Sequence, residues 1–72
     1  MKLMLVMYFC SALANDCQAP HVMPETYNDY NTCMTAGYES ALRKTKEVGK
    51  EDINKYMIFI KFTCKQDTRT AT

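Results

Sequence analysis

The stretch that most constrains the fold is residues 55–65, "KYMIFIKFTCK", because its residues fall into two alternating rows. One row holds Tyr56, Ile58, Ile60, Phe62 and Cys64, and the other holds Met57, Phe59, Lys61, Thr63 and Lys65. A period of two is typical of a β-strand with one buried face. The stretch therefore predicts a strand whose first row needs a covering layer and whose terminal cysteine needs a partner.

The length and charge of the chain limit what that layer can be. Seventy-two residues allow one small domain, which lies near the lower limit of independent stability. Chains of this size often need a disulfide, a metal ion or a partner. The formal net charge is +1, which gives no electrostatic footprint for nucleic acid. We therefore expect a small α+β domain that does not bind nucleic acid.

Residues 1–14, "MKLMLVMYFCSALA", have the pattern of a secretory signal peptide. One lysine is followed by an apolar run and then by small residues that suit cleavage after Ala14. An apolar helix of this length would be too short to cross a bilayer. A short buried core segment is the alternative interpretation. We predict export, contact with the membrane only transiently through this leader, and a periplasmic or extracellular destination where cysteines form disulfides.

The mature chain would begin near Asn15 with an irregular segment, residues 15–31. Pro20 and Pro24 restrict any extended stretch there to an edge strand. Residues 32–65 form the predicted helix–strand core, and residues 66–72 a mobile tail. This division predicts one domain behind a leader.

Residues 32–48 predict an amphipathic helix, because the apolar residues fall on one half of a helical wheel. Asn31 or Thr32 can cap its start, and Gly49 suits the left-handed position that ends a helix. Gly37 lies on the buried half, which predicts close packing of the helix against the sheet. Residues 49–55 read as a polar connection to the strand.

A disulfide between Cys33 and Cys64 would explain why the strand ends in cysteine. A helix and strand of these lengths can lie antiparallel, which places the first turn of the helix beside the end of the strand. Closing this loop should stabilise the fold by roughly 3 to 4 kcal/mol. The fold class is therefore one amphipathic helix on a two- or three-stranded sheet, stapled by one disulfide. If the segment before the helix pairs parallel to the final strand, a right-handed β-α-β unit results.

Cys17 is left without an assigned partner. It could remain a free thiol, bond to Cys33 instead, or form an intermolecular disulfide. Cys10 could be its partner only if the leader were retained. Exposed sheet edges and the second row of the strand favour self-association or docking onto another protein.

No chemical motif stands out. His21 and Cys17 lie close in sequence, but nucleophilic catalysis also needs an orienting group, and zinc needs three or four ligands. We therefore predict no enzymatic activity, no metal site and no cofactor, and keep an enzyme or metal protein using Cys17 and His21 as the weakest alternative. A possible contact patch consists of Tyr27, Tyr30, Met57 and Phe59.

The run "TCMTAGYESALRKTKEV…INKYMIFIKFTCK" resembles a group of small exported proteins of unknown function from marine phage and bacterial genomes. The shared pattern is a helix opening C-x-x-x-G-Y and a strand ending in an aromatic residue, one further residue and cysteine. The resemblance implies a phage or bacterial origin and a periplasmic destination, without any assigned activity. The predicted function is thus a small exported binding protein whose partner is unknown, with a structural subunit of a larger assembly as the alternative.

Overall fold

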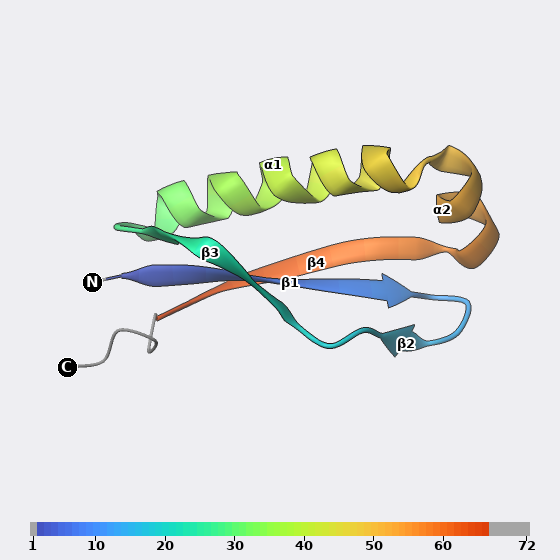
Figure 1. Ribbon diagram of the computed structural model, residues 1–72, viewed down its shortest axis with the longest axis horizontal. Coiled ribbons are helices and arrows are strands. Elements are labelled where there is room, and N and C mark those ends of the chain that lie inside the picture. The colour runs from blue at the N-terminus through green and yellow to red at the C-terminus, as the bar shows by residue number, and fades with distance from the viewer. Residues whose placement is uncertain (1, 67–72) are drawn as a thin grey trace.

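The computed structural model describes residues 2–66 and has an α+β fold, as the sequence predicted (Figure 1). A four-stranded antiparallel sheet is covered on one side by one long and one short helix. In chain order the elements are β1 (Leu3–Ser11), β2 (Asp16–Cys17), β3 (His21–Tyr27), α1 (Tyr30–Val48), α2 (Lys50–Tyr56) and β4 (Ile58–Gln66). The molecule is elongated, with principal extents of 44 × 20 × 15 Å.

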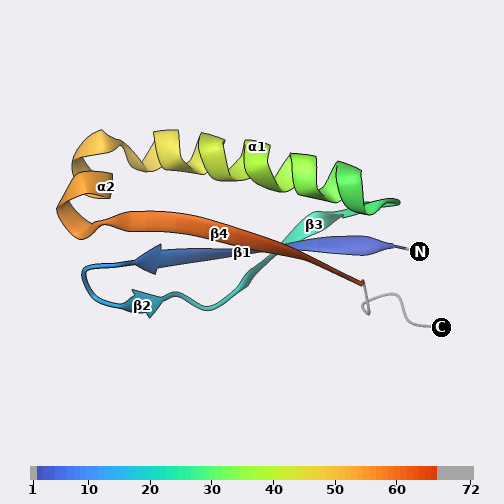
Figure 2. The ribbon, with the colours of Figure 1, turned by 180° about the vertical axis from the view of Figure 1, so that it is seen from behind.

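The central strand of the sheet is β1, which pairs with the other three strands (Figure 2). On one side β4 pairs with it over its whole length, from Leu3 opposite Gln66 to Ser11 opposite Ile58. On the other side β3 pairs with its first half and β2 with its end. The expected parallel pairing between residues 15–31 and the final strand is wrong. β3 and β4 do run in the same direction, but β1 lies between them, because its apolar residues complete the sheet.

The segment predicted as a leader supplies much of the core in this structure. Leu3, Leu5, Val6, Met7 and Cys10 of β1 are each at most 5% exposed. Among residues 2–66, β3 and β4 pair with no strand other than β1. This fold therefore requires that Leu3–Ser11 stay attached, and loss of residues 1–14 would remove both the ladder and the core.

The core lies between the sheet and α1. Leu3, Leu5 and Met7 point to the helix side and cluster with Cys33. The partly buried residues packed around this cluster are Phe9, Met23, Tyr27, Ala41, Ile60, Phe62 and Cys64. The alternation predicted for the final strand is confirmed from Ile58 onward, since Ile60, Phe62 and Cys64 face the core while Phe59 and Lys61 are exposed. Tyr56, predicted in the buried row, instead ends α2 and is 45% exposed.

Helix α1 begins earlier than predicted and ends where predicted. Its N-cap is Asp29, rather than Asn31 or Thr32, because the Asp29 carboxylate accepts a hydrogen bond from the Thr32 amide at 2.9 Å. At the other end Gly49 has φ 96°, a conformation that favours glycine. The predicted polar connection is instead the short helix α2. Glu51 and Asp52 in its first turn and Lys55 in its last turn complement the helix dipole.

Close packing at Gly37 is confirmed. A Cβ atom at this position would overlap the aromatic ring of Phe62 in β4. The neighbouring Tyr38 packs edge-on against the same ring, with centroids 4.9 Å apart. Gly37 thus allows α1 to approach the sheet closely enough for Cys33 to reach Cys64.

Candidate interaction surface

The sheet has one face that no described helix or strand covers, because α1 and α2 both lie on the opposite side (Figure 1). Strand register and alternation assign the residues of this open face. They are Met4, Val6, Tyr8 and Cys10 of β1, Phe59, Lys61, Thr63 and Lys65 of β4, Val22 and Thr26 of β3, and Cys17 of β2. The open face is therefore built from all four strands.

Aromatic and aliphatic groups occupy the middle of the open face. Tyr8 lies opposite Lys61, whose Nζ is 5.4 Å from the centroid of the tyrosine ring. Phe59 lies next along β4 and is 46% exposed. Val22 on β3 is 41% exposed, whereas Val6 between the outer strands is buried. The face thus presents apolar area beside a cation that is already in contact with an aromatic ring.

All the charged residues that the strand register places on the open face are positive. Lys61 and Lys65 lie there, opposite Tyr8 and Met4. Asp16 is opposite Ser11, which belongs to the helix-side row of β1. Among described residues whose face the register fixes, the open face carries lysines and no carboxylate. Such a surface suits a partner that supplies both apolar contacts and negative charge.

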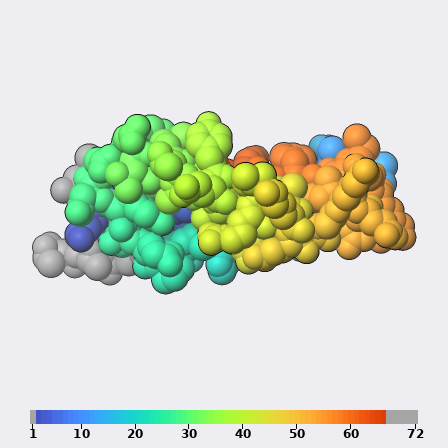
Figure 3. All heavy atoms as spheres, turned by 90° about the horizontal axis from the view of Figure 1, so that it is seen from above, coloured from blue at the N-terminus to red at the C-terminus, as the bar shows by residue number. Residues whose placement is uncertain are grey.

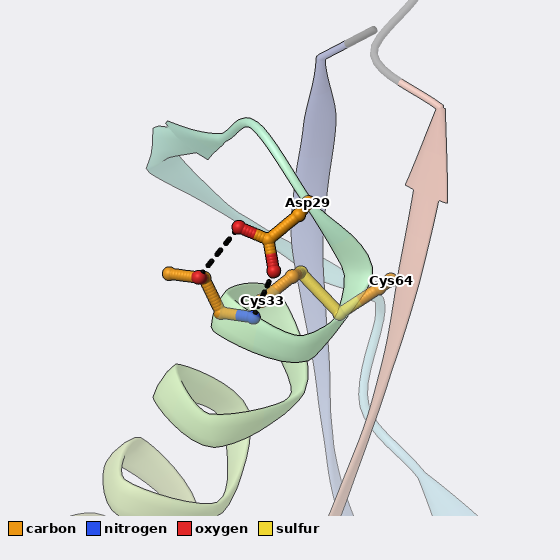
Figure 4. The surroundings of a disulfide bond; sticks show 4 residues. Asp29, Cys33 and Cys64 are labelled. Carbon is orange, nitrogen blue, oxygen red and sulfur yellow. Dashed lines mark hydrogen bonds between the residues drawn. A yellow bond between two sulfur atoms is a disulfide. The ribbon is translucent and has the colours of Figure 1, made fainter.

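Two disulfides hold the edges of this sheet. The predicted Cys33–Cys64 bridge is present and joins the first turn of α1 to β4 (Figure 4). The second bridge joins Cys10 to Cys17 across the β1–β2 hairpin. Cys17 is therefore neither free nor bonded to Cys33, and described residues 2–66 include no free cysteine. This pairing is the one that sequence reasoning allowed only with a retained leader.

The helix cap beside the first disulfide fixes where α1 starts. The Asp29 carboxylate accepts from both the amide and the hydroxyl of Thr32, at 2.9 and 2.7 Å (Figure 4). The Thr32 hydroxyl, followed by the Thr32 amide, lowers the pKa of Asp29 below its usual value of 3.8. Because Cys33 follows directly and its amide donates to the Asp29 carbonyl at 3.2 Å, the cap places the cysteine in the first turn.

The predicted contact patch is not brought together as one surface. Tyr27 lies opposite Leu3 and packs against the core, and Tyr30 begins α1 at the same end of the molecule. Met57 and Phe59 lie at the other end, near Ser11. Of these four residues only Phe59 is placed on the open face by the register. Sequence reasoning missed Tyr8, because the alternation of β1 is hidden in an almost wholly apolar run.

Residues 2–66 contain no group of three or more His, Cys, Asp or Glu side chains placed to hold a metal ion. His21 is exposed at the start of β3, and the Cys17 sulfur is bonded to Cys10. No helix in the described part of the chain combines the length and apolar character needed to cross a membrane.

Comparison with known proteins adds no assignment. No family model matches the chain, and no curated protein or solved structure gives a significant match.

Proposed function

We propose that this protein is a small exported interaction protein that binds an acidic protein surface through its open face. The observation that carries the proposal is the one-sided covering of the sheet. Phe59 is 46% exposed there, and it lies beside the paired Tyr8 and Lys61. An exposed apolar and aromatic area is typical of a site that another macromolecule covers, and here the only charged side chains beside it that the register places are lysines.

Export is supported by the two disulfides, which are consistent with an oxidising compartment. The charged start and apolar run of residues 1–14 support the same destination. We propose that this segment directs export and then stays in the folded protein as β1. The resemblance to phage and bacterial exported proteins supports action in the periplasm or envelope of a bacterial host. Intact-mass measurement of exported protein tests retention, since cleavage after Ala14 would remove fourteen residues.

Two other functions rank lower. A structural subunit of a larger assembly is the main alternative, and the outer edge of β4, to which no strand of residues 2–66 pairs, favours it. Catalysis by Cys17 and His21 would need a thiolate. In the proposed oxidised form Cys17 is bonded to Cys10 and cannot provide one.

A site-specific photocrosslinking experiment tests binding by the open face. A benzophenone amino acid replaces Phe59 in one variant and Tyr30 in the matched control, since both are exposed aromatic residues and Tyr30 lies off the open face. The oxidised full-length variants are irradiated with a periplasmic extract of a bacterial host. We expect a discrete crosslinked protein of acidic isoelectric point from position 59 and none from position 30.

Charge reversal then separates specific binding from nonspecific contact. Lys61→Glu should reduce the yield at position 59 at least several-fold, and 0.5 M salt should reduce it as well. Equal crosslinking at both positions, or a yield unaffected by Lys61→Glu, would reject the open face as the binding surface.

A further inference from the structure

The outer edge of β4 offers backbone hydrogen-bonding groups to which no described strand is paired. Among residues 2–66, β4 pairs only with β1. In an antiparallel ladder, alternate residues direct their backbone groups to the same neighbour. The Ala12 amide donates to the Met57 carbonyl at 2.9 Å, so the odd-numbered residues are those that face β1. The even-numbered residues of β4 therefore point outward: Ile58, Ile60, Phe62, Cys64 and Gln66.

An uncharged flank of α1 lies above this edge. Tyr38 is 65% exposed although its ring packs on Phe62 of β4. Leu42, one turn later, is 58% exposed and borders a surface groove on the other side of α1. That groove, of about 820 Å³, is also lined by Arg43, Glu47 and Tyr27 of β3. Seen from above, β4 is visible beside α1 along one rim of the molecule (Figure 3).

We propose that a second copy of this chain pairs with the outer edge of β4, forming a two-fold dimer with a continuous antiparallel sheet centred on Phe62. The five outward residues are symmetric about Phe62. In this register Ile58 meets Gln66, Ile60 meets Cys64, and Phe62 meets its own copy, so every outward backbone group is paired. The axis is perpendicular to the sheet, so both copies of Tyr38 lie on one side, near the centre.

Separation of like charges favours this register over its neighbours. Centred on Phe62, the pairing places Lys61 opposite Thr63 and Lys65 opposite Phe59 of the second copy. A centre at residue 61 would place Lys61 opposite itself, and a centre at residue 63 would place Lys61 opposite Lys65. Like charges directly opposite are destabilising. Within the described strand, Ile58–Gln66, a centre at Ile60 or Cys64 would pair only three of the five outward residues.

Amide hydrogen exchange tests the dimer without any substitution. In this ladder the amides of Phe59, Lys61 and Thr63 donate hydrogen bonds to β1, and they should exchange slowly at every concentration. Those of Ile60, Phe62 and Cys64 point outward and should exchange at least tenfold more slowly in a dimeric sample than at low micromolar concentration. Sedimentation equilibrium on the oxidised full chain gives the mass. A monomer up to 1 mM, or outward amides whose exchange is independent of concentration, would overturn the proposal.

A charge on the flank provides the variant test. Tyr38→Glu places a carboxylate near its own copy and should weaken association at least tenfold. Tyr30→Glu is the matched control, because Tyr30 is similarly exposed at the start of α1, and it should associate like the wild type. Circular dichroism verifies that both variants fold. Isotope-filtered NOEs between Ile60 of one copy and Cys64 of the other should appear in the wild type. A dimer with contacts elsewhere, or one insensitive to Tyr38→Glu, contradicts the proposed pairing.

Discussion

Cys10 and Cys17 lie opposite each other at the end of the β1–β2 hairpin, and their sulfur atoms are bonded. The turn between the strands, residues 12–15, is exposed. The Ser11 hydroxyl donates to the Tyr56 carbonyl at 2.6 Å, so the hairpin is also tied to the end of α2. The segments before and after this exposed turn are thus covalently linked by the disulfide, and the segment before it is also hydrogen-bonded to α2.

A cut in this turn should leave the molecule in one piece. We expect that a specific protease site inserted between Ala14 and Asn15 will be cleaved in the native protein, because the turn is exposed. The two fragments should stay joined through Cys10–Cys17 until a reductant is added. Mass spectrometry before and after reduction measures this. The Cys10→Ala/Cys17→Ala variant is the control, whose denatured fragments should separate without reductant; a native chain that resists cleavage would contradict the exposed turn.

Two leucines in the predicted leader should respond differently to truncation. Leu5 is 1% exposed and Leu13 is 65% exposed. Leu5→Ala should lower the free energy of unfolding of the full chain by about 2 to 5 kcal/mol, because it leaves a cavity between sheet and helix. Leu13→Ala should change it by about 0.5 kcal/mol or less. Urea unfolding followed by circular dichroism compares them. Equal small effects would mean that residues 1–14 lie outside the folded core.

The two disulfides should stabilise the chain unequally. Cys33–Cys64 closes a loop with a sequence separation of 31, and Cys10–Cys17 one of 7. Chain entropy then predicts losses of roughly 3.7 and roughly 2.5 kcal/mol when each pair is replaced by alanine. Urea titrations of the two double variants give the order. The reverse order would indicate that the hairpin bridge contributes more than its loop length explains.

Gly37→Ala should destabilise the protein although alanine is the better helix former. The propensity gain is about 1 kcal/mol, whereas overpacking against Phe62 costs about 1 to 3 kcal/mol. We expect a lower melting temperature. In the Phe62→Leu background the same substitution should cost less, because the ring that the added methyl group meets is gone. An identical effect in both backgrounds would show that the helix does not approach β4 at this point.

Acid should weaken the start of α1 through Asp29. The pKa of Asp29 is lowered in the folded protein, chiefly by the Thr32 hydroxyl. A lowered pKa means that this contribution to stability is present above the unfolded value and is lost as the pH falls through the folded value. Carboxyl chemical shifts followed by NMR should report a pKa below 3.8, and Thr32→Ala should raise it. If the pKa of Asp29 were unchanged in the Thr32→Ala variant, the Thr32 hydroxyl would not be the cause of the lowered pKa.

The sequence alone determined the local features whose causes are local. The alternation in residues 55–65 defined which face of β4 is buried, and Gly49 marked the end of α1. Wheel position placed Cys33 and Gly37 correctly on the buried side, but Tyr38 and Leu42, predicted on the same half, are 65% and 58% exposed. The Cys33–Cys64 disulfide was predicted by matching the lengths of the helix and the strand, which needs no knowledge of the rest of the chain. These inferences succeeded because period and termination are properties of neighbouring residues.

Only the tertiary structure showed where Leu3–Ser11 lies in the fold. A nine-residue segment that is apolar except at its end satisfies the requirements of a leader and of a strand buried between two others, and the sequence pattern does not distinguish them. Pairing on both edges gave this run its place in the sheet and gave Cys17 its partner Cys10. It also determined that Tyr8 and Lys61 share the open face, which no described helix covers. Such relationships depend on which strands become neighbours, and that choice is made by packing the whole chain.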